Sequence, residues 1–255
     1  MLEVLGAKDF FRSENRGSEM SVTAAADEPF AVLDESVLEA MEVRHDPYDY
    51  AFVEGVMPMA RRDEILADCP VIPHRGTYGV PSLKYGPSFA LVLKDLQSPR
   101  FRKIVERKFG VDLSKGVPTL VMMGSTTGHY NEGYAHPDSK HKLFTVLLGF
   151  TREYPYERGR LRILRSDNRD DYAFEYAPEY GKMCLFKVSE KSWHGFLPQK
   201  SERKSLQFCW VDSKAYAMET YARHAVSAWA KATPGFNKLL EYVPRNWRKT
   251  LTGRQ

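Results

Sequence analysis

The stretch KLFTVLLGF, residues 142–150, is one of several short runs of strand-forming residues that follow Gly116. Turn residues separate it from its neighbours, as is typical of consecutive β-strands. So many short strands within one region predict a β-barrel or a β-sandwich. The other runs are VPTLVMMG (117–124), GRLRIL (159–164), YAFEYA (172–177), GKMCLFKV (181–188) and SLQFCWV (205–211).

Helical patterns flank these strands on both sides. Apolar residues recur at helical spacing over residues 88–109, and the Ser98-Pro99 pair within that range predicts a break between two helices. Upstream, the aromatic stretch YDYAFVEGV (48–56) predicts a strand with a short helix after it. The Ala-rich run at 214–232 predicts a helix that covers the barrel.

The composition is that of an ordinary folded domain, with 43% hydrophobic and 27% charged residues. The formal charge of +4 is far below that of a dedicated nucleic-acid binder, so no nucleic-acid partner is expected. The three cysteines lack CxxC spacing, which argues against a disulfide framework and fits a reducing cytoplasm. No apolar run is long enough for a membrane span, and we expect a soluble, cytoplasmic protein.

The segment His136-Pro137-Asp138 offers two metal ligands at a spacing that suits one ion. In an extended chain, residues i and i+2 point to the same side, so both side chains can reach a shared metal. A non-haem iron centre takes two imidazoles and one carboxylate and leaves its other positions for cosubstrate and oxygen. A His-x-acid tripeptide alone is common by chance, so the interpretation depends on the strand-like run directly after it and on the distant His194.

These features resemble the prolyl-hydroxylase-like branch of the iron(II) and 2-oxoglutarate dependent dioxygenases. That branch combines an HxD motif with a distal histidine and, nine residues later, an arginine followed by x-Ser. The resemblance covers about residues 118–212 and extends more loosely back to Tyr48. By this resemblance His136, Asp138 and His194, called the metal triad below, are the iron ligands and the catalytic residues.

The resemblance implies a mainly β fold with flanking helices (α+β) around a double-stranded β-helix core of the jelly-roll or cupin-like kind. The HxD motif is expected near the second core strand and the distal histidine near the seventh. Residues 1–28 lack a sustained period and are expected to be a poorly ordered lead-in, in which Met20 is a candidate true start. Residues 29–255 are expected to form a single oxygenase domain, with helical support at about 58–110, the β-core at about 117–213, C-terminal helices at 214–244 and a basic tail at 245–255.

Arg203 and Ser205 are the candidates for binding 2-oxoglutarate. A guanidinium donates two parallel hydrogen bonds to a carboxylate and keeps its charge, so Arg203 suits the distal carboxylate of the cosubstrate. Ser205 would add a hydroxyl from the same strand face. Tyr130, six residues before His136, is a further candidate that could hydrogen-bond cosubstrate or substrate.

Each assignment has a simpler alternative. Arg203 could be a surface ion-pair residue, His194 a buried structural histidine and Tyr130 an ordinary barrel tyrosine. Arg152 is a rival anchor for the cosubstrate. His129 and His141 flank the motif, but neither has an acid two residues on.

The resemblance implies iron(II), 2-oxoglutarate and O2 as the reacting set, with ascorbate as a candidate reductant. Relatives that halogenate lack the carboxylate of the triad, so Asp138 favours hydroxylation. Many members carry Gly-Gly-x-Thr where this chain has GRLR (159–162), which favours a polar small molecule such as a sugar, amino acid or natural-product intermediate over a peptide. A prolyl or other protein hydroxylase is the alternative enzyme. A cupin-like protein that binds a metal or ligand without oxidation, or a zinc hydrolase, is the alternative of another class.

Two charged segments each have two possible roles. Residues 152–171 are dense in Arg and Asp and could form a lid over a polar or anionic substrate, or only a solvated loop. The tail 245–255 carries basic residues without an acid and could be a solvated end or a weak anionic contact.

Overall fold

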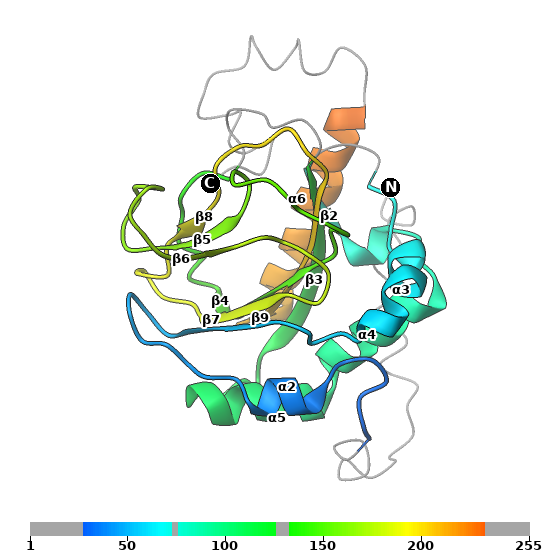
Figure 1. The fold of residues 1–255 in the computed structure, drawn as a ribbon, viewed down its shortest axis with the longest axis horizontal. Helices are drawn as coiled ribbons and strands as arrows, with labels where there is room; N and C mark the ends of the chain where they lie inside the picture. Colours follow the sequence, from blue (N-terminus) through cyan, green and yellow to red (C-terminus); the bar gives the residue numbers. More distant parts are fainter. Residues whose placement is uncertain (1–27, 73–75, 126–132, 233–255) are drawn as a thin grey trace.

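The computed structural model describes residues 28–72, 76–125 and 133–232. Within them, two antiparallel sheets face each other, and helices gather on one side of the larger sheet (Figure 1). The expected lead-in, the tail and the end of the C-terminal helical region lie outside the described residues. The double-stranded β-helix predicted from the sequence is confirmed.

The larger sheet has six strands in the order β1-β7-β4-β9-β3-β2, and the smaller sheet has three in the order β6-β5-β8. The larger sheet consists of β1 (Tyr50–Val53), β7 (Met183–Lys187), β4 (Lys142–Gly149), β9 (Arg203–Val211), β3 (Val117–Ser125) and β2 (Gly76–Gly79). The smaller sheet consists of β6 (Tyr172–Tyr176), β5 (Leu161–Leu164) and β8 (His194–Gly195).

The order of pairing along the chain places the triad on two neighbouring core segments. Counting from β3, the second segment is not a full strand but an isolated antiparallel bridge between His136 and His194. β4 to β7 then follow as the third to sixth segments, so that β8, which contains His194, is the seventh. Both histidines therefore lie where the resemblance implied.

Alternation along β9 separates the core from the site. Leu206, Phe208 and Trp210 point into the main apolar core. The alternate residues of the strand, among them Ser205 and Cys209, point to the opposite face, because successive side chains of a strand alternate. That opposite face turns toward the smaller sheet and carries the polar groups of the site.

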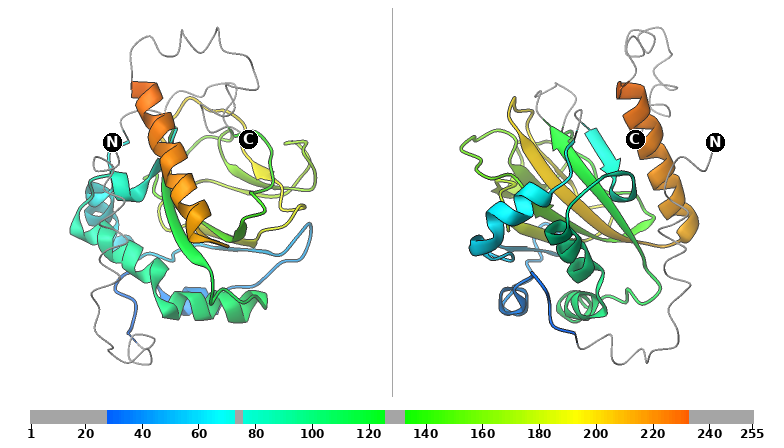
Figure 2. Two further views of the ribbon diagram at one scale, coloured as in Figure 1. Left: turned by 180° about the vertical axis from the view of Figure 1, so that it is seen from behind. Right: turned by 90° about the vertical axis from the view of Figure 1, so that its right-hand side faces the viewer.

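The helices on the core side are α2 to α5, and they pack on the larger sheet through Leu38, Ile65, Phe89 and Phe101 (Figure 2). The predicted break at Ser98 is confirmed, because its hydroxyl accepts a hydrogen bond from the Phe101 amide at 3.1 Å and caps the second helix. The bounds are α2 (Glu35–Glu39), η4 (Met59–Arg61), α3 (Arg62–Asp68), η5 (Val80–Ser82), α4 (Pro87–Gln97) and α5 (Pro99–Phe109).

The last described helix, α6 (Lys214–Ala232), packs at the other side of the barrel. Its Tyr216 and Ala217 contact Cys209 and Val211 of β9. The hydroxyl of Tyr221 accepts a hydrogen bond from the Leu120 amide of β3 at 3.0 Å, which fixes the helix against the sheet. The helix thus forms a wall beside the barrel, as its sequence predicted.

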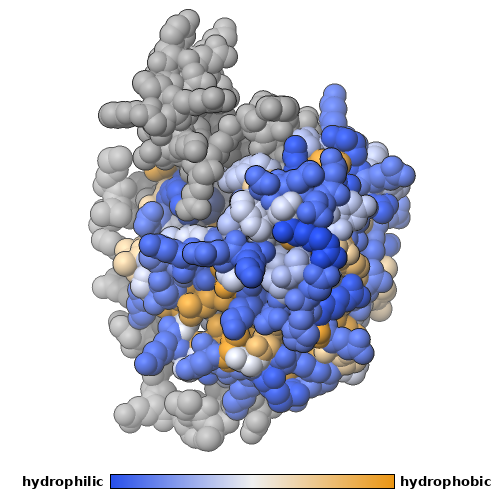
Figure 3. Space-filling model, turned by 90° about the vertical axis from the view of Figure 1, so that its left-hand side faces the viewer, coloured by the Kyte–Doolittle hydropathy of each residue, from blue (hydrophilic) through white to orange (hydrophobic). Residues whose placement is uncertain are grey.

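The face of the molecule opposite β2 and α6 is mostly hydrophilic, with smaller apolar patches between charged side chains (Figure 3). Large apolar side chains are instead concentrated in the core between the larger sheet and the helices. Within the described part of the chain, no helix has the length and apolar character needed to cross a membrane.

Candidate metal centre

The metal triad converges at the edge between the two sheets. The ligand atoms that His136, Asp138 and His194 offer all lie within 4.8 Å of one another. Two backbone hydrogen bonds fix the two histidines: the His136 amide donates to the His194 carbonyl at 3.1 Å, and the His194 amide donates to the His136 carbonyl at 3.0 Å. The extended backbone then brings Asp138 to the same side as His136, as its spacing predicted.

Backbone carbonyls select the tautomer of both imidazoles. His136 Nδ1 lies 3.0 Å from the Tyr134 carbonyl, and His194 Nδ1 lies 2.9 Å from the Ser192 carbonyl. A carbonyl only accepts, so each Nδ1 carries a proton, and Nε2 is the atom that each ring can offer to a metal. Such outer hydrogen bonds orient the ring and raise the basicity of the ligand.

His194 is buried, with 4% of the residue exposed. Burial, with the nearby His136, lowers the pKa of its imidazole to about 4. The ring is therefore neutral at pH 7, which is the state that binds a metal. The ring of Phe186 lies 4.9 Å from it, centroid to centroid, and covers one side.

Asp138 is held by two groups of β4. Lys142 Nζ lies 2.6 Å from Oδ1, and the Thr145 hydroxyl donates to Oδ2 at 2.7 Å. Burial opposes the charge on Asp138, but the Lys142 ammonium stabilises it by its charge and its hydrogen bond and holds the pKa of Asp138 well below the usual value. The carboxylate is ionised and oriented, and each oxygen retains a further lone pair for a metal.

A β-bulge brings Lys142 and Thr145 to the same carboxylate. The pairing of β4 with β9 shifts between Lys142 and Phe144, so that Leu143 is an extra residue in the strand. Without it, residues three apart would point to opposite faces. The bulge therefore supplies both partners of Asp138.

Arg203 lies between the sheets at the start of β9. Its side chain is buried, its Nε donates to the Gly159 carbonyl at 3.0 Å, and its guanidinium lies 4.1 Å over the Phe196 ring. Its Nη1 lies 3.4 Å from the hydroxyl of Ser205. Arg203 is therefore not a surface ion-pair residue, and its guanidinium is held in a fixed orientation inside the fold.

The rival residues lie elsewhere or outside the described part. His141 pairs with Asp212 at 2.7 Å, away from the triad. Arg152 is half exposed and forms an ion pair with Asp63 at 2.6 Å. Tyr130 and His129 fall within residues 126–132, which the structure does not describe.

Arginines of the charged segment 152–171 form ion pairs with acidic residues inside and outside the segment. Arg162 forms ion pairs with Glu175 at 2.9 Å and Asp170 at 3.1 Å. Arg165 pairs with Asp46 at 2.5 Å. These pairs link the segment to the smaller sheet and to the residues before β1.

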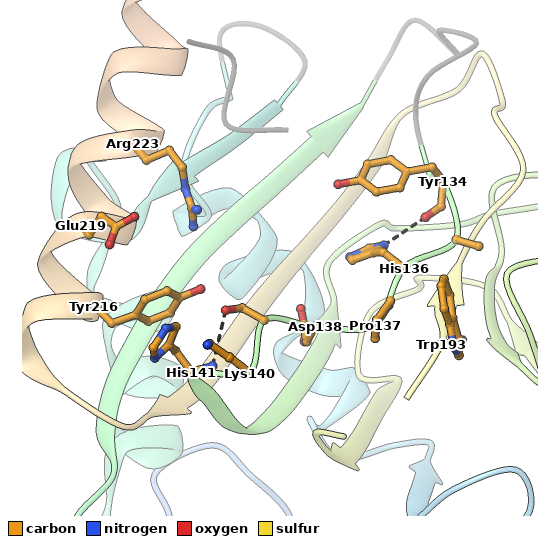
Figure 4. A pocket seen from close by; sticks show the side chains of 12 residues that line it. Tyr134, His136, Pro137, Asp138, Lys140, His141, Trp193, Tyr216, Glu219 and Arg223 are labelled. Atoms are coloured by element: carbon orange, nitrogen blue, oxygen red, sulfur yellow. Dashed lines mark hydrogen bonds between the residues drawn. The ribbon is translucent and has the colours of Figure 1, made fainter. Parts of the chain in front are cut away.

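A cavity of about 730 Å³ opens beside the triad (Figure 4). The HxD segment forms its floor and α6 forms the opposite wall. Arg203 is not among the described residues that line it. The lining side chains that the argument uses below are Tyr134, Lys140, Trp193, Tyr216, Glu219 and Arg223.

Comparison with known proteins finds one family model that matches the β-core. Residues 119–212 match the family model described as the 2OG-Fe(II) oxygenase superfamily. The match covers the β-core of this chain. The matched range extends from β3 to β9 and includes the whole triad and Arg203.

Solved structures with a similar arrangement include two prolyl hydroxylases. A prolyl-4-hydroxylase of Pseudomonas putida is 15% identical at a TM-score of 0.45, covering 69% of this chain and 91% of that chain. The viral collagen prolyl hydroxylase of Paramecium bursaria Chlorella virus-1, in its 2OG complex, is 15% identical at a TM-score of 0.41, and the match covers 64% of this chain and 94% of that chain. AviO1 of Streptomyces viridochromogenes Tue57 is 12% identical at a TM-score of 0.44, and the match covers 72% of this chain and 97% of that chain. No curated protein matches the sequence.

The match to this family model, together with the His-Asp-His group, supports a dioxygenase that uses iron(II), 2-oxoglutarate and O2. The donor set fits that metal, because two imidazoles and one carboxylate converge on one point. Sequence reasoning missed Lys142 and Thr145 as partners of Asp138, and it missed the contribution of α6 to the cavity. The one sequence signal for these partners was the strand-forming run at residues 142–150, which contains both and directly follows the HxD motif.

Proposed function

We propose that this oxygenase hydroxylates a polar small molecule in the cavity beside the triad. The observation that carries the proposal is the convergence of His136, Asp138 and His194 within a family that uses iron(II). When bound, the iron and its cosubstrate supply oxygen activation. The chain itself supplies oriented ligands, a carboxylate anchor and a pocket.

Each residue of the triad has a defined task in this proposal. His136 and His194 present Nε2 to the metal, because their Nδ1 protons are held by carbonyls. Asp138 supplies the negative ligand and is kept ionised by Lys142. The retained carboxylate favours hydroxylation over halogenation.

The cosubstrate is assigned to the space around Arg203. Its fixed guanidinium would bind the distal carboxylate of 2-oxoglutarate, and the nearby Ser205 hydroxyl would add a hydrogen bond. The exposed Arg152 points to Asp63 and does not serve this role.

The cavity supports a small-molecule substrate. Its volume of about 730 Å³ lies within the usual range of small-ligand pockets. Aromatic and charged side chains share its wall, which suits a molecule with both an apolar body and polar groups. A peptide substrate, as for the prolyl hydroxylases of similar fold, is the alternative outcome of the test.

The test is incubation of the full chain with iron(II), 2-oxoglutarate and labelled oxygen in a fractionated cell extract, followed by mass spectrometry. We expect succinate together with a small molecule that is heavier by one labelled oxygen atom. A label found only in peptides would move the function to a protein hydroxylase. A protein that makes no succinate in air, with substrate-containing extract present, would contradict the oxygenase proposal.

A further inference from the structure

The side of α6 that faces the cavity carries side chains at helical spacing. Tyr216, Glu219 and Arg223 stand at i, i+3 and i+7, which places them on one side of the helix. All three line the cavity, opposite the HxD segment (Figure 4). The wall contributed by α6 thus brings a cation, an anion and a phenol toward the triad.

Arg223 is the unusual member of this wall. Its Nε is buried and has no hydrogen-bond partner in the described part of the structure. Glu219, four residues earlier, is at the spacing of a helical ion pair, yet no such pair forms among the described residues. A buried N–H of a charged group without an acceptor costs free energy, and this arginine therefore lacks the partner that would offset that cost.

The rest of the cavity fits a ligand with an anionic group and an apolar body. Lys140 brings a second cation from the loop after Asp138, and no ion pair involves it among the described residues. The rings of Tyr134, Trp193 and Tyr216 line the same space. Two acidic residues are among the described residues that line the cavity. Asp138 belongs to the triad and pairs with Lys142, so Glu219 is the acidic residue of the lining outside the triad.

We propose that Arg223 is a specificity-determining residue that binds a carboxylate or phosphate group of the substrate. The guanidinium would donate to the anion, with Lys140 as the second cation and the aromatic rings against the body of the molecule. This inference rests on the proposed function and narrows its substrate class to anionic small molecules. Because Arg203 does not line the cavity, the substrate anion and the 2-oxoglutarate carboxylate have separate arginines.

The test measures binding and does not require turnover. The full chain is saturated with Mn(II) and 2-oxoglutarate, which fills the site around Arg203 without oxidation. Isothermal titration calorimetry then compares phenyl phosphate and benzoate with their neutral counterparts, benzyl alcohol and benzamide. We expect at least one anion to bind more tightly than its neutral counterpart, and the preferred anion separates a phosphate from a carboxylate substrate.

Variants of α6 give the decisive comparison. Arg223→Gln should weaken binding of the preferred anion by about 10-fold to 100-fold, since a charge-assisted hydrogen bond is lost, and should leave the neutral probes unchanged. Arg223→Lys should recover part of the loss. Glu219→Gln should tighten anion binding, because a nearby negative charge is removed, which a purely structural arginine would not predict. The matched control is Arg152→Gln, which changes an arginine outside the cavity.

Three results would overturn the inference: no anion binding by the wild type, equal binding of anionic and neutral probes, or unchanged anion affinity in Arg223→Gln. If that variant does not fold by circular dichroism, Arg223→Lys and Glu219→Gln decide the question. Binding of 2-oxoglutarate to the Mn(II)-loaded protein is measured in parallel. If 2-oxoglutarate binds and Arg223 has no effect, only this inference fails; if 2-oxoglutarate does not bind, the proposed function fails.

Discussion

Asp138 and Lys142 form an ion pair whose side chains are only 4% and 15% exposed. A pair taken out of water contributes little net stability, but removal of one partner leaves an uncompensated buried charge. The bound metal is the other cation that Asp138 can use. In the metal-free protein, Lys142 therefore takes over the neutralising role.

The variant Lys142→Met should lower the free energy of unfolding of the metal-free protein by about 3 kcal/mol. The loss should shrink when Mn(II) is saturating, because the metal then neutralises Asp138. Urea unfolding followed by circular dichroism, with and without Mn(II), measures both values. Lys140→Met is the control, since Lys140 is exposed and should cost little. An equal loss in the two states would show that the pair acts independently of the metal.

The variant Arg203→Ala should weaken 2-oxoglutarate binding by about 1.5 to 3 kcal/mol, the value of a hydrogen bond to a charged group. Metal affinity should stay nearly constant, because Arg203 is not one of the three residues whose ligand atoms converge. Titration of the anaerobic iron(II) protein with 2-oxoglutarate, followed by the visible charge-transfer absorbance, gives the affinity. Arg152→Ala serves as the control, and a comparable loss in that variant would move the anchor to Arg152.

At the scale of elements, the short strand β8 determines how closely the HxD segment approaches His194. Gly195 makes this approach possible. A Cβ at that position would lie 2.8 Å from the Gly133 carbonyl oxygen and 3.0 Å from that of Tyr134. These are backbone atoms, so the neighbouring segment would have to move as a whole.

We therefore expect Gly195→Ala to displace the HxD segment and to weaken Mn(II) binding at least 10-fold, which corresponds to about 1.4 kcal/mol. Electron paramagnetic resonance of free Mn(II) during a titration measures the affinity. Gly110→Ala is the matched control: a Cβ there meets nothing within 4 Å, although its φ of +60° makes the variant less stable. Loss of metal affinity in both variants would indicate general destabilisation and not a local effect at β8.

For the whole molecule, the triad links the two sheets, because His136 forms a bridge with His194 of β8 and Asp138 contacts Lys142 and Thr145 of β4. A metal held there binds only the folded chain, since the unfolded chain does not bring the three ligands together. The free energy of binding is then added to the stability of the fold.

Saturation with Mn(II) at 100 times its dissociation constant should raise the free energy of unfolding by about 2.7 kcal/mol. Addition of 2-oxoglutarate should raise it further in the wild type. Differential scanning calorimetry at fixed protein concentration measures the increments. His194→Ala should abolish the metal increment, and a persistent increment in that variant would place the bound metal elsewhere.

Much of the architecture follows from the sequence because it depends on local patterns. Runs such as residues 142–150 can bury an apolar face only as strands, and Ser98-Pro99 ends one helix and begins the next. The spacing in His136-Pro137-Asp138 places both side chains on one side of an extended chain. These features need only neighbouring residues, so the strands, the helix break and the shared orientation of His136 and Asp138 were predictable, whereas His194 was predicted only through the family resemblance.

The tertiary structure alone decided which distant groups serve the site. Lys142 and Lys140 are alike in sequence, but the bulge at Leu143 and the pairing of β4 with β9 turn only Lys142 toward Asp138. In the same way, the position of Arg223 depends on the packing of α6 beside the barrel. The physical reason is that contacts between residues far apart in the chain depend on register and packing, which local propensity does not specify.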